Sequence, residues 1–308
     1  MNSETFKKTL SALSPVIWAP EEKPCAILQI THGMTEHIGR YEYFAKILNS
    51  YGILVAGFDL RGHGTNLAES RCASFRINGW ESSIEDIHQF YQLLKHSYPE
   101  IPHFMFGFSL GSFLLREYLS IYSEDQIAGA IIAGTGEQPK FLLQILISII
   151  KTQVQKAGFD NTTPLVKKLS FETYNQKFAP NKTAFDWLCS DENELALYCA
   201  DPMCSDSISS GLFLQLLESM KQVNGIKSYQ NWNRKTPILL LSGKNDPVGD
   251  FGKGVLQVEK SMNQAHLNCT MELIDDARHD LLHEENSGAA EKARIIIIQW
   301  ILKQLKNT

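Results

Sequence analysis

Short apolar runs alternate with amphipathic stretches along most of the chain. The runs that are candidates for strands are Ala26–Thr31, Ile53–Phe58, Phe104–Phe108, Ile127–Ala133, Ile238–Leu241 and Cys269–Ile274. Most are continuous rather than alternating, which is typical of parallel strands buried on both faces. The intervening stretches predict helices at Tyr41–Asn49, Ser83–Ser97, Gly111–Tyr122, Lys253–Met262 and Ala289–Leu305. This alternation predicts an α/β protein with a doubly wound, mostly parallel sheet flanked by helices.

One region interrupts the alternation. Residues 135–233 have a mostly helical pattern with no clear parallel strand, and they follow the fourth predicted parallel strand. We expect a helical cap or lid here, inserted into an α/β core made of residues 1–134 and 234–308. Its first stretch, Phe141–Ile150, is apolar on nearly every face, so it either contacts a ligand or surface or simply packs the cap onto the core.

Composition and charge exclude several classes of protein. With 44% hydrophobic and 20% charged residues, the 308-residue chain is not a disordered protein. The net charge is −5 and no basic stripe occurs, so nucleic acid is not an expected partner. The first ten residues lack the apolar core of a secretory signal, and no apolar run is long enough to span a bilayer. We therefore expect a soluble, cytoplasmic protein whose six cysteines are reduced.

The segment from Gly107 to Gly111 reads Gly-Phe-Ser-Leu-Gly and fits the motif G-x-S-x-G. It follows an apolar strand and precedes a helical run, which is the strand–turn–helix setting that a nucleophile elbow requires. The sharp turn exposes the hydroxyl of Ser109, and small residues are needed where the chain would collide across the turn. Ser109 is therefore the candidate nucleophile, and the N–H of Leu110 would face the oxyanion of a tetrahedral intermediate.

A second oxyanion donor is expected from the loop after an earlier strand. His32-Gly33-Met34 directly follows Ala26–Thr31, and the glycine allows the backbone to approach a substrate. The N–H of Met34 is the natural second donor. His32 itself is expected to organise the loop.

A serine hydroxyl needs a base, usually a histidine that a carboxylate orients. His279 follows the last predicted strand, and Asp246 follows the strand before it, so the order is Ser, acid, His. Both lie after the carboxyl ends of strands, where doubly wound sheets bind ligands. His63, in the loop after Ile53–Phe58, is the alternative base. The competing acids are Asp250, Asp275 and Asp276.

Two histidines near the end of the chain are spaced as metal ligands can be, whereas glycine-rich nucleotide motifs are missing from the sequence. His279 and His283 are four residues apart and would share a face if the segment were helical, as zinc ligands do. No third ligand is evident, and His279 already fits a loop after a strand. Neither G-x-G-x-x-G nor G-x-x-x-x-G-K-[ST] occurs. We therefore expect no metal and no cofactor.

Taken together, these motifs resemble the α/β-hydrolase superfamily, and within it the monoacylglycerol lipase and bacterial lysophospholipase group. The residues that carry the resemblance are His32–His37 with Gly39–Tyr41, Asp59–Gly64, the elbow, Ser242–Val248, Ala277–His279 and, in the cap, Trp187, Leu188, Tyr198, Asp201, Pro202 and Cys204. The elbow departs from the usual G-H-S-M-G-G of this group at Phe108, Leu110 and Ser112. None of these changes removes a catalytic group.

The resemblance implies an α/β-hydrolase fold and serine-dependent hydrolysis of acyl esters. The leading hypothesis is a carboxylic ester hydrolase that acts on single-chain lipid esters, monoacylglycerols or lysophospholipids, through an acyl-enzyme. The alternatives are hydrolysis or acyl transfer of small non-lipid esters or amides, and a non-catalytic binding protein on the same fold. The expected partners are a small acyl ester and, through apolar cap residues such as Leu142, Leu143, Ile145 and Leu146, a membrane or micelle surface.

Overall fold

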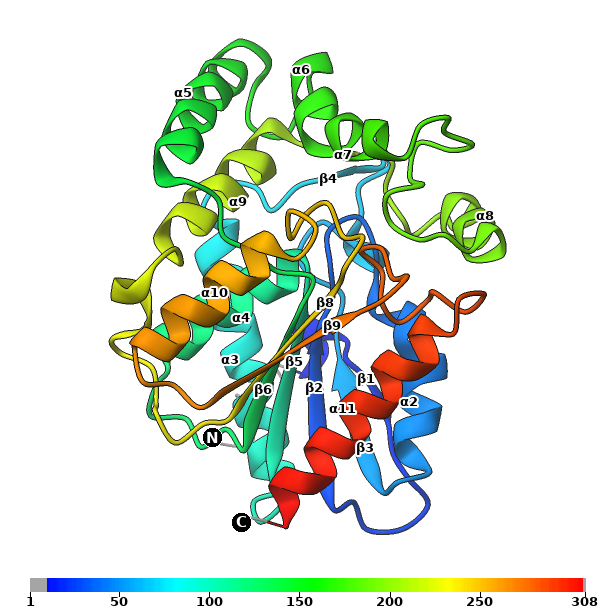
Figure 1. The fold of residues 1–308 in the computed structure, drawn as a ribbon, viewed down its shortest axis with the longest axis vertical. Coiled ribbons are helices and arrows are strands. Elements are labelled where there is room, and N and C mark those ends of the chain that lie inside the picture. Colours follow the sequence, from blue (N-terminus) through cyan, green and yellow to red (C-terminus); the bar gives the residue numbers. More distant parts are fainter. Residues whose placement is uncertain (1–9, 307–308) are drawn as a thin grey trace.

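A computed structural model describes residues 10–306 of the chain, and its centre is a twisted seven-stranded sheet (Figure 1). The strands are β1 (Val16–Trp18), β2 (Ala26–Thr31), β3 (Ile53–Gly57), β5 (His103–Phe108), β6 (Gly129–Ala133), β8 (Ile238–Gly243) and β9 (Cys269–Ile274). Their order across the sheet is β1-β3-β2-β5-β6-β8-β9. β1 is antiparallel to β3, and the other neighbours are parallel. The expected mostly parallel sheet is confirmed.

Three short strands were not expected from the sequence. β1 lies at the sheet edge, where Val16 and Ile17 are exposed. β4 (Cys72–Ala73) and β7 (Ser207–Ile208) form a separate two-stranded parallel sheet. The expectation that residues 135–233 contain no parallel strand is therefore wrong at β7. A strand of two or three residues is too short to show a period of two in its side chains.

Helices cover both faces of the sheet (Figure 1). α2 (Glu42–Asn49) and α11 (Ala289–Leu305) lie on one face, and α3 (Gly79–Ser97), α4 (Leu110–Ile121) and α10 (Lys253–Gln264) lie on the other. Along β5, Phe104 and Phe106 belong to the core under the first pair, and Met105 belongs to the core under the second group. Burial on both faces explains why the inner strands, β2, β3, β5, β6 and β8, read as continuous apolar runs.

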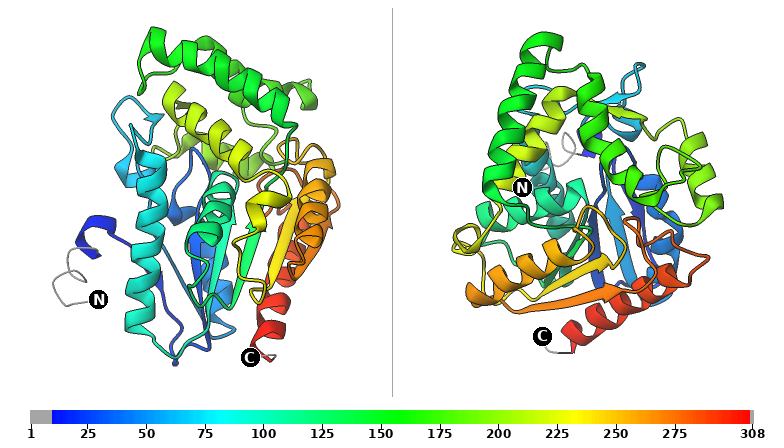
Figure 2. Two further views of the ribbon diagram at one scale, coloured as in Figure 1. Left: turned by 90° about the vertical axis from the view of Figure 1, so that its left-hand side faces the viewer. Right: turned by 45° about the horizontal axis from the view of Figure 1, so that its top comes forward.

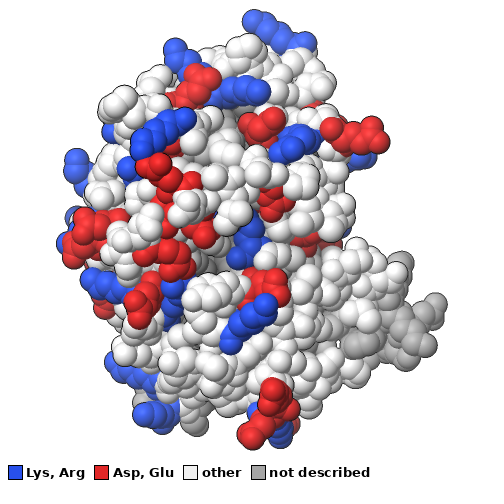
Figure 3. Space-filling view, turned by 90° about the vertical axis from the view of Figure 1, so that its right-hand side faces the viewer, with Lys and Arg blue, Asp and Glu red and all other residues white. Residues whose placement is uncertain are grey.

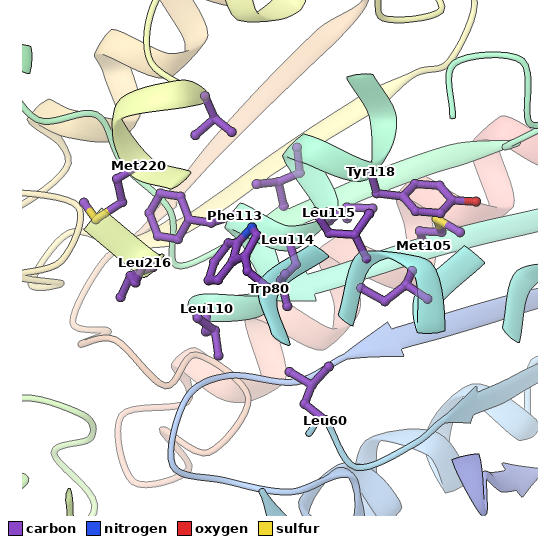
Figure 4. Close-up of a cluster of buried hydrophobic side chains, with 14 of the residues drawn as sticks. Leu60, Trp80, Met105, Leu110, Phe113, Leu114, Leu115, Tyr118, Leu216 and Met220 are labelled. Carbon is purple, nitrogen blue, oxygen red and sulfur yellow. The ribbon is translucent and has the colours of Figure 1, made fainter. Parts of the chain in front are cut away.

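α4 is packed on several sides by apolar side chains (Figure 4). Leu114 and its helical neighbours contact Met105 of the sheet, Trp80 of α3, and Leu216 and Met220 of α9 (Ser210–Gln222). These side chains are all buried. Because α4 is fixed on both sides, the residue just before it, Ser109, is held at the carboxyl end of β5.

Between β6 and β8 the chain leaves the sheet and forms a group of helices over the carboxyl ends of the strands (Figures 1 and 2). These helices are α5 (Lys140–Ala157), α6 (Pro164–Lys167), α7 (Thr173–Asn175), α8 (Glu192–Ala200) and α9. α5 packs along α9, and α9 packs on α4. None of the helices in residues 10–306 is both long enough and apolar enough to cross a membrane.

The surface carries charges of both signs. On the face shown in Figure 3, Lys and Arg side chains are interspersed with Asp and Glu among broad uncharged areas. Within the described residues seen there, the basic groups form no continuous stripe.

Candidate active site

Ser109 occupies a strained turn between β5 and α4. Its backbone angles are φ 51° and ψ −115°, outside the regions that residues with side chains favour. The turn is held by hydrogen bonds. Ser109 N–H donates to the carbonyl oxygen of Ala133 at 3.0 Å, and its own carbonyl accepts from the N–H and the hydroxyl of Ser112 at 2.8 and 2.6 Å. Backbone strain held in this way is a common feature of functional sites.

The two glycines of the motif allow the chain to approach itself closely. A Cβ on Gly107 would lie 2.5 Å from the carbonyl oxygen of Gly111. A Cβ on Gly111 would lie 2.1 Å from the carbonyl oxygen of Thr31, at the end of β2. Any side chain at Gly111 would therefore push the turn that carries Ser109 away from the neighbouring strand.

Ser109, His279 and Asp246 come together above the sheet. The distance from His279 Nε2 to Ser109 Oγ is 2.8 Å, and that from His279 Nδ1 to Asp246 Oδ1 is 2.9 Å. A carboxylate only accepts hydrogen bonds, so the proton of the neutral imidazole lies on Nδ1 and Nε2 accepts from the serine hydroxyl. His279 and Asp246 are buried. The arrangement can remove a proton from Ser109.

Asp246 is fixed by two further donors. Val248 N–H donates to Oδ1 at 2.8 Å, and the Ser242 hydroxyl donates to Oδ2 at 3.2 Å. The competing acids lie elsewhere: Asp275 pairs with Lys244 at 2.6 Å on the surface, and Asp250 and Asp276 are exposed.

His63 and His32 are buried, and their ring nitrogens bond backbone groups rather than Ser109. His63 Nδ1–H donates to the carbonyl of Arg61 at 2.8 Å, and burial, with His32 beside it, lowers the pKa of His63 to about 3. His32 donates to the carbonyl of Gly33 at 2.7 Å and accepts from Leu60 N–H at 2.9 Å. Burial lowers the pKa of His32 as well. Both rings therefore brace loops in their neutral forms.

The two residues whose N–H groups are the expected oxyanion donors lie beside Ser109. Met34 and Leu110 line the cavity beside the serine. Within residues 10–306, the backbone N–H groups of Met34 and Leu110 have no acceptor in the protein. The Met34 loop is held because Gly33 N–H donates to Glu36 Oε1 at 2.6 Å. Two free N–H groups beside a serine hydroxyl can stabilise an oxyanion.

An apolar cavity of about 320 Å³ opens beside Ser109. Most of its lining side chains are apolar: Leu110, Phe113, Leu142, Leu143, Leu146, Leu169, Trp187, Phe213, Leu216, Leu217, Met220 and Val248. Three of them come from the start of α5, so part of the apolar stretch seen in the sequence lines this cavity. Other residues of α5 face outward, and Phe141 and Ile145 are 72% and 53% exposed.

A second, much smaller space of about 20 Å³ also borders Ser109, and the charged side chains of Glu36, Arg40 and Asp280 form part of its otherwise largely apolar lining. Arg40 donates to Glu36 at 2.5 Å and to Asp280 at 2.8 Å, and its guanidinium lies 5.1 Å from the centre of the Tyr198 ring. Burial alone would raise the pKa of Asp280, but His283 and Arg40 outweigh it and hold that pKa well below its usual range. Apart from the family resemblance, the sequence analysis did not predict this cluster of Glu36, Arg40 and Asp280. The one local indication was that Glu36 and Arg40 are four residues apart, a spacing at which opposite charges can pair.

The residues present do not favour a metal at His279. The segment from His279 to His283 is not helical, and His283 bonds Asp280 at 2.8 Å instead. Elsewhere in residues 10–306, one set of three possible ligands meets: His37, Asp201 and Cys204, whose ligand atoms lie within 4.8 Å of one another. There His37 donates to Asp201 at 2.8 Å, joining the loop after β2 to the segment after α8.

The sheet order and the serine turn define an α/β-hydrolase fold. The chain belongs to the Hydrolase_4 family, described as serine aminopeptidase S33, which matches residues 22–286. A monoglyceride lipase homolog of monkeypox virus is 27% identical over 94% of both chains, and rat monoglyceride lipase is 27% identical over 92% of this chain and 84% of its own.

Among solved structures, a carboxyl esterase from Bacillus coagulans superposes with a TM-score of 0.86, at 25% identity over 94% of both chains. The protein is therefore a serine hydrolase of the monoglyceride lipase and esterase group.

Proposed function

We propose that the protein is a carboxylic ester hydrolase that acts on single-chain lipid esters, monoacylglycerols or lysophospholipids, through an acyl-enzyme. The observation that carries this proposal is that the Ser109 hydroxyl, bonded to His279 at 2.8 Å, lies at the wall of an apolar cavity of about 320 Å³. Small-molecule sites of this size commonly combine apolar walls with a few polar groups. Monoglyceride lipases among the relatives support the same substrate class.

In the first half-reaction, His279 Nε2 takes the proton of Ser109 Oγ while the oxygen attacks the ester carbonyl carbon. The carbonyl oxygen becomes an oxyanion that accepts hydrogen bonds from the N–H groups of Met34 and Leu110. Each such donor contributes about 3 kcal/mol to the transition state. Asp246 holds the protonated imidazole and balances its charge.

The tetrahedral intermediate then collapses. His279 Nε2–H protonates the alkoxy oxygen, the alcohol leaves, and the acyl group remains bound to Ser109 Oγ. A water molecule gives a proton to His279 and attacks the acyl carbon. The carboxylic acid leaves and Ser109 recovers its proton, so atoms and charge balance over the cycle.

The two spaces that border Ser109 suggest how the ester is oriented. The acyl chain lies in the apolar cavity, where each buried methylene contributes about 0.8 kcal/mol. The alcohol part lies toward Glu36, Arg40 and Asp280. Residues 135–233 act as a cap that supplies much of the acyl wall. The exposed apolar face of α5, at Phe141 and Ile145, contacts the membrane or micelle from which the substrate is taken.

A substrate panel tests the proposal. Wild type and Ser109→Ala are assayed with 1-octanoylglycerol, a lysophosphatidylcholine, p-nitrophenyl acetate and an amino-acid p-nitroanilide. We expect wild type to hydrolyse one or both lipid esters with the highest kcat/KM and the variant to hydrolyse none. A preference for the acetate or the anilide would instead favour a small-ester or amide hydrolase. No turnover of any substrate would favour a binding protein.

A further inference from the structure

Trp187 covers the histidine of the site from the cap side. Its ring centre lies 5.2 Å from that of His279, 6.0 Å from Phe171 and 5.4 Å from Tyr174. The side chain is buried, and it lines both the apolar cavity and the smaller space beside Ser109 that Glu36, Arg40 and Asp280 border. Trp187 therefore lies where the acyl part and the alcohol part of an ester would meet.

The backbone around Trp187 is bonded to the loop that carries His279. Leu188 carbonyl accepts from Asp280 N–H at 2.7 Å, and Cys189 carbonyl accepts from the Arg278 guanidinium at 3.2 Å. On the cap side, Trp187 N–H donates to the Asn175 side chain at 3.1 Å. These bonds on both sides fix the indole relative to the imidazole.

The indole N–H of Trp187 is an unused donor. Its nitrogen is shielded and has no hydrogen-bond acceptor among residues 10–306. A buried donor without an acceptor is costly. Trp232 carries a second such donor, but of the two only Trp187 lines the spaces beside Ser109, and this position favours a ligand atom as its partner. Neighbouring polar groups are already engaged: Arg40 is bonded to Glu36 and Asp280, and the Tyr198 hydroxyl to Thr35.

The chemistry of an ester restricts which atom this donor can meet. The hydrocarbon of the acyl chain accepts no hydrogen bond. In the proposed reaction the carbonyl oxygen faces Met34 and Leu110, and the alkoxy oxygen faces His279. The oxygens that remain are hydroxyl or other polar oxygens on the alcohol part of the substrate.

We propose that Trp187 is a substrate-binding residue whose indole N–H donates to a free hydroxyl of the alcohol part, and that it selects polyol esters over simple alkyl esters. This inference rests on the proposed ester hydrolase activity and adds to it a determinant of alcohol specificity that lies in the cap.

The test uses one substitution and two matched substrates. Trp187→Phe keeps an aromatic ring beside Phe171, Tyr174 and His279 and removes the N–H. 1-Octanoylglycerol and propyl octanoate share an acyl chain and a three-carbon alcohol and differ in two hydroxyls. Both are assayed as dissolved monomers, below the micelle-forming concentration of 1-octanoylglycerol and below the solubility limit of propyl octanoate. Trp232→Phe is the control, because Trp232 is also buried with an unbonded indole N–H but does not line either space.

We expect Trp187→Phe to lower kcat/KM for 1-octanoylglycerol about fivefold to tenfold, the effect of losing one uncharged hydrogen bond. For propyl octanoate the change is expected to stay within twofold, and Trp232→Phe is expected to leave both values unchanged. Equal losses of kcat/KM on both esters would show that Trp187 only packs the site and does not bind a hydroxyl of the substrate. Unchanged kinetics on both would show that the N–H is not used. Failure of wild type to hydrolyse either ester would instead overturn the proposed function.

Discussion

Replacing Asp246 by asparagine tests how the buried carboxylate acts on His279. An amide in place of the carboxylate could turn its NH₂ group toward His279 Nδ1. The imidazole would then carry its proton on Nε2 and could not accept the proton of Ser109. The surroundings of Asp246 argue for a different result. Oδ1 accepts from both His279 and Val248 N–H, and Oδ2 accepts from the Ser242 hydroxyl.

An amide in this position has one favourable orientation. With its oxygen at the Oδ1 position, it accepts from Val248 N–H and from His279 Nδ1–H, and its NH₂ meets the Ser242 hydroxyl, which can also accept. The reverse orientation would place NH₂ against the Val248 N–H. The Asp246→Asn variant should therefore keep the imidazole in its working tautomer and lose only the negative charge.

The size of the loss follows from that charge. Two unit charges about 4 Å apart interact by about 4 kcal/mol at an effective dielectric constant of about 20. Since about 1.4 kcal/mol is a factor of ten in rate, kcat/KM should fall on the order of 10³-fold. If the asparagine instead held the imidazole in the wrong tautomer, kcat/KM would fall about 10⁴-fold, as the rate does when the corresponding aspartate of a serine protease is replaced by asparagine.

The assay is kcat/KM for p-nitrophenyl octanoate, with Asp250→Asn as the matched control at the exposed competing acid. We expect the control to retain wild-type activity. Asp246→Asn activity within tenfold of wild type would refute the view that this carboxylate stabilises the imidazolium. A comparable loss in the control would show that the acid role is shared or misassigned.

Three further changes probe the cavity, the buried histidines and the outer face of the cap. Leu146→Trp should fill part of the cavity, so kcat/KM should fall at least tenfold more for p-nitrophenyl decanoate than for p-nitrophenyl acetate. Equal losses on the two esters would show that Leu146 does not contact the acyl chain. His63 has a folded-state pKa of about 3, below its unfolded value, so its contribution to stability is lost as pH falls from about 6.5 toward 3. The free energy of unfolding in urea should therefore fall with pH between 5.5 and 4 in both proteins, but less steeply in His63→Phe than in wild type, by about 1.4 kcal/mol per pH unit. Parallel curves for the two proteins would contradict the low pKa of His63. Combined Phe141→Asp and Ile145→Asp should weaken sedimentation with phosphatidylcholine vesicles while leaving hydrolysis of a dissolved short ester unchanged; undiminished sedimentation would exclude this face as the contact.

The sequence was most informative where one local pattern determines the structure. Gly107–Gly111 requires a tight turn between a buried strand and a helix, and the strained backbone of Ser109 is the result. Asp246 and His279 follow neighbouring strands, β8 and β9, so their loops meet at one edge of a parallel sheet. Chain order together with strand ends was enough to nominate them.

The walls of the site were less accessible to sequence reasoning. The apolar cavity is assembled from α4, α5, α9 and the segment before α8, and no periodicity within one helix reveals which of its apolar residues face a cavity. Trp187 is an example, because its place beside His279 depends on hydrogen bonds between the Leu188–Cys189 backbone and the 278–280 loop. The pairing of β4 with β7 likewise depends on the folded chain, since neither strand exceeds two residues.

The most direct test of the central claim is labelling with a fluorophosphonate, followed by peptide mapping by mass spectrometry. The folded wild-type protein should take up one probe per chain, on the peptide that contains Ser109. Ser109→Ala should take up none, and His279→Ala should react far more slowly although its serine is intact. Full labelling of Ser109→Ala at another residue, or no labelling of folded wild type, would contradict the assignment of Ser109 as the nucleophile.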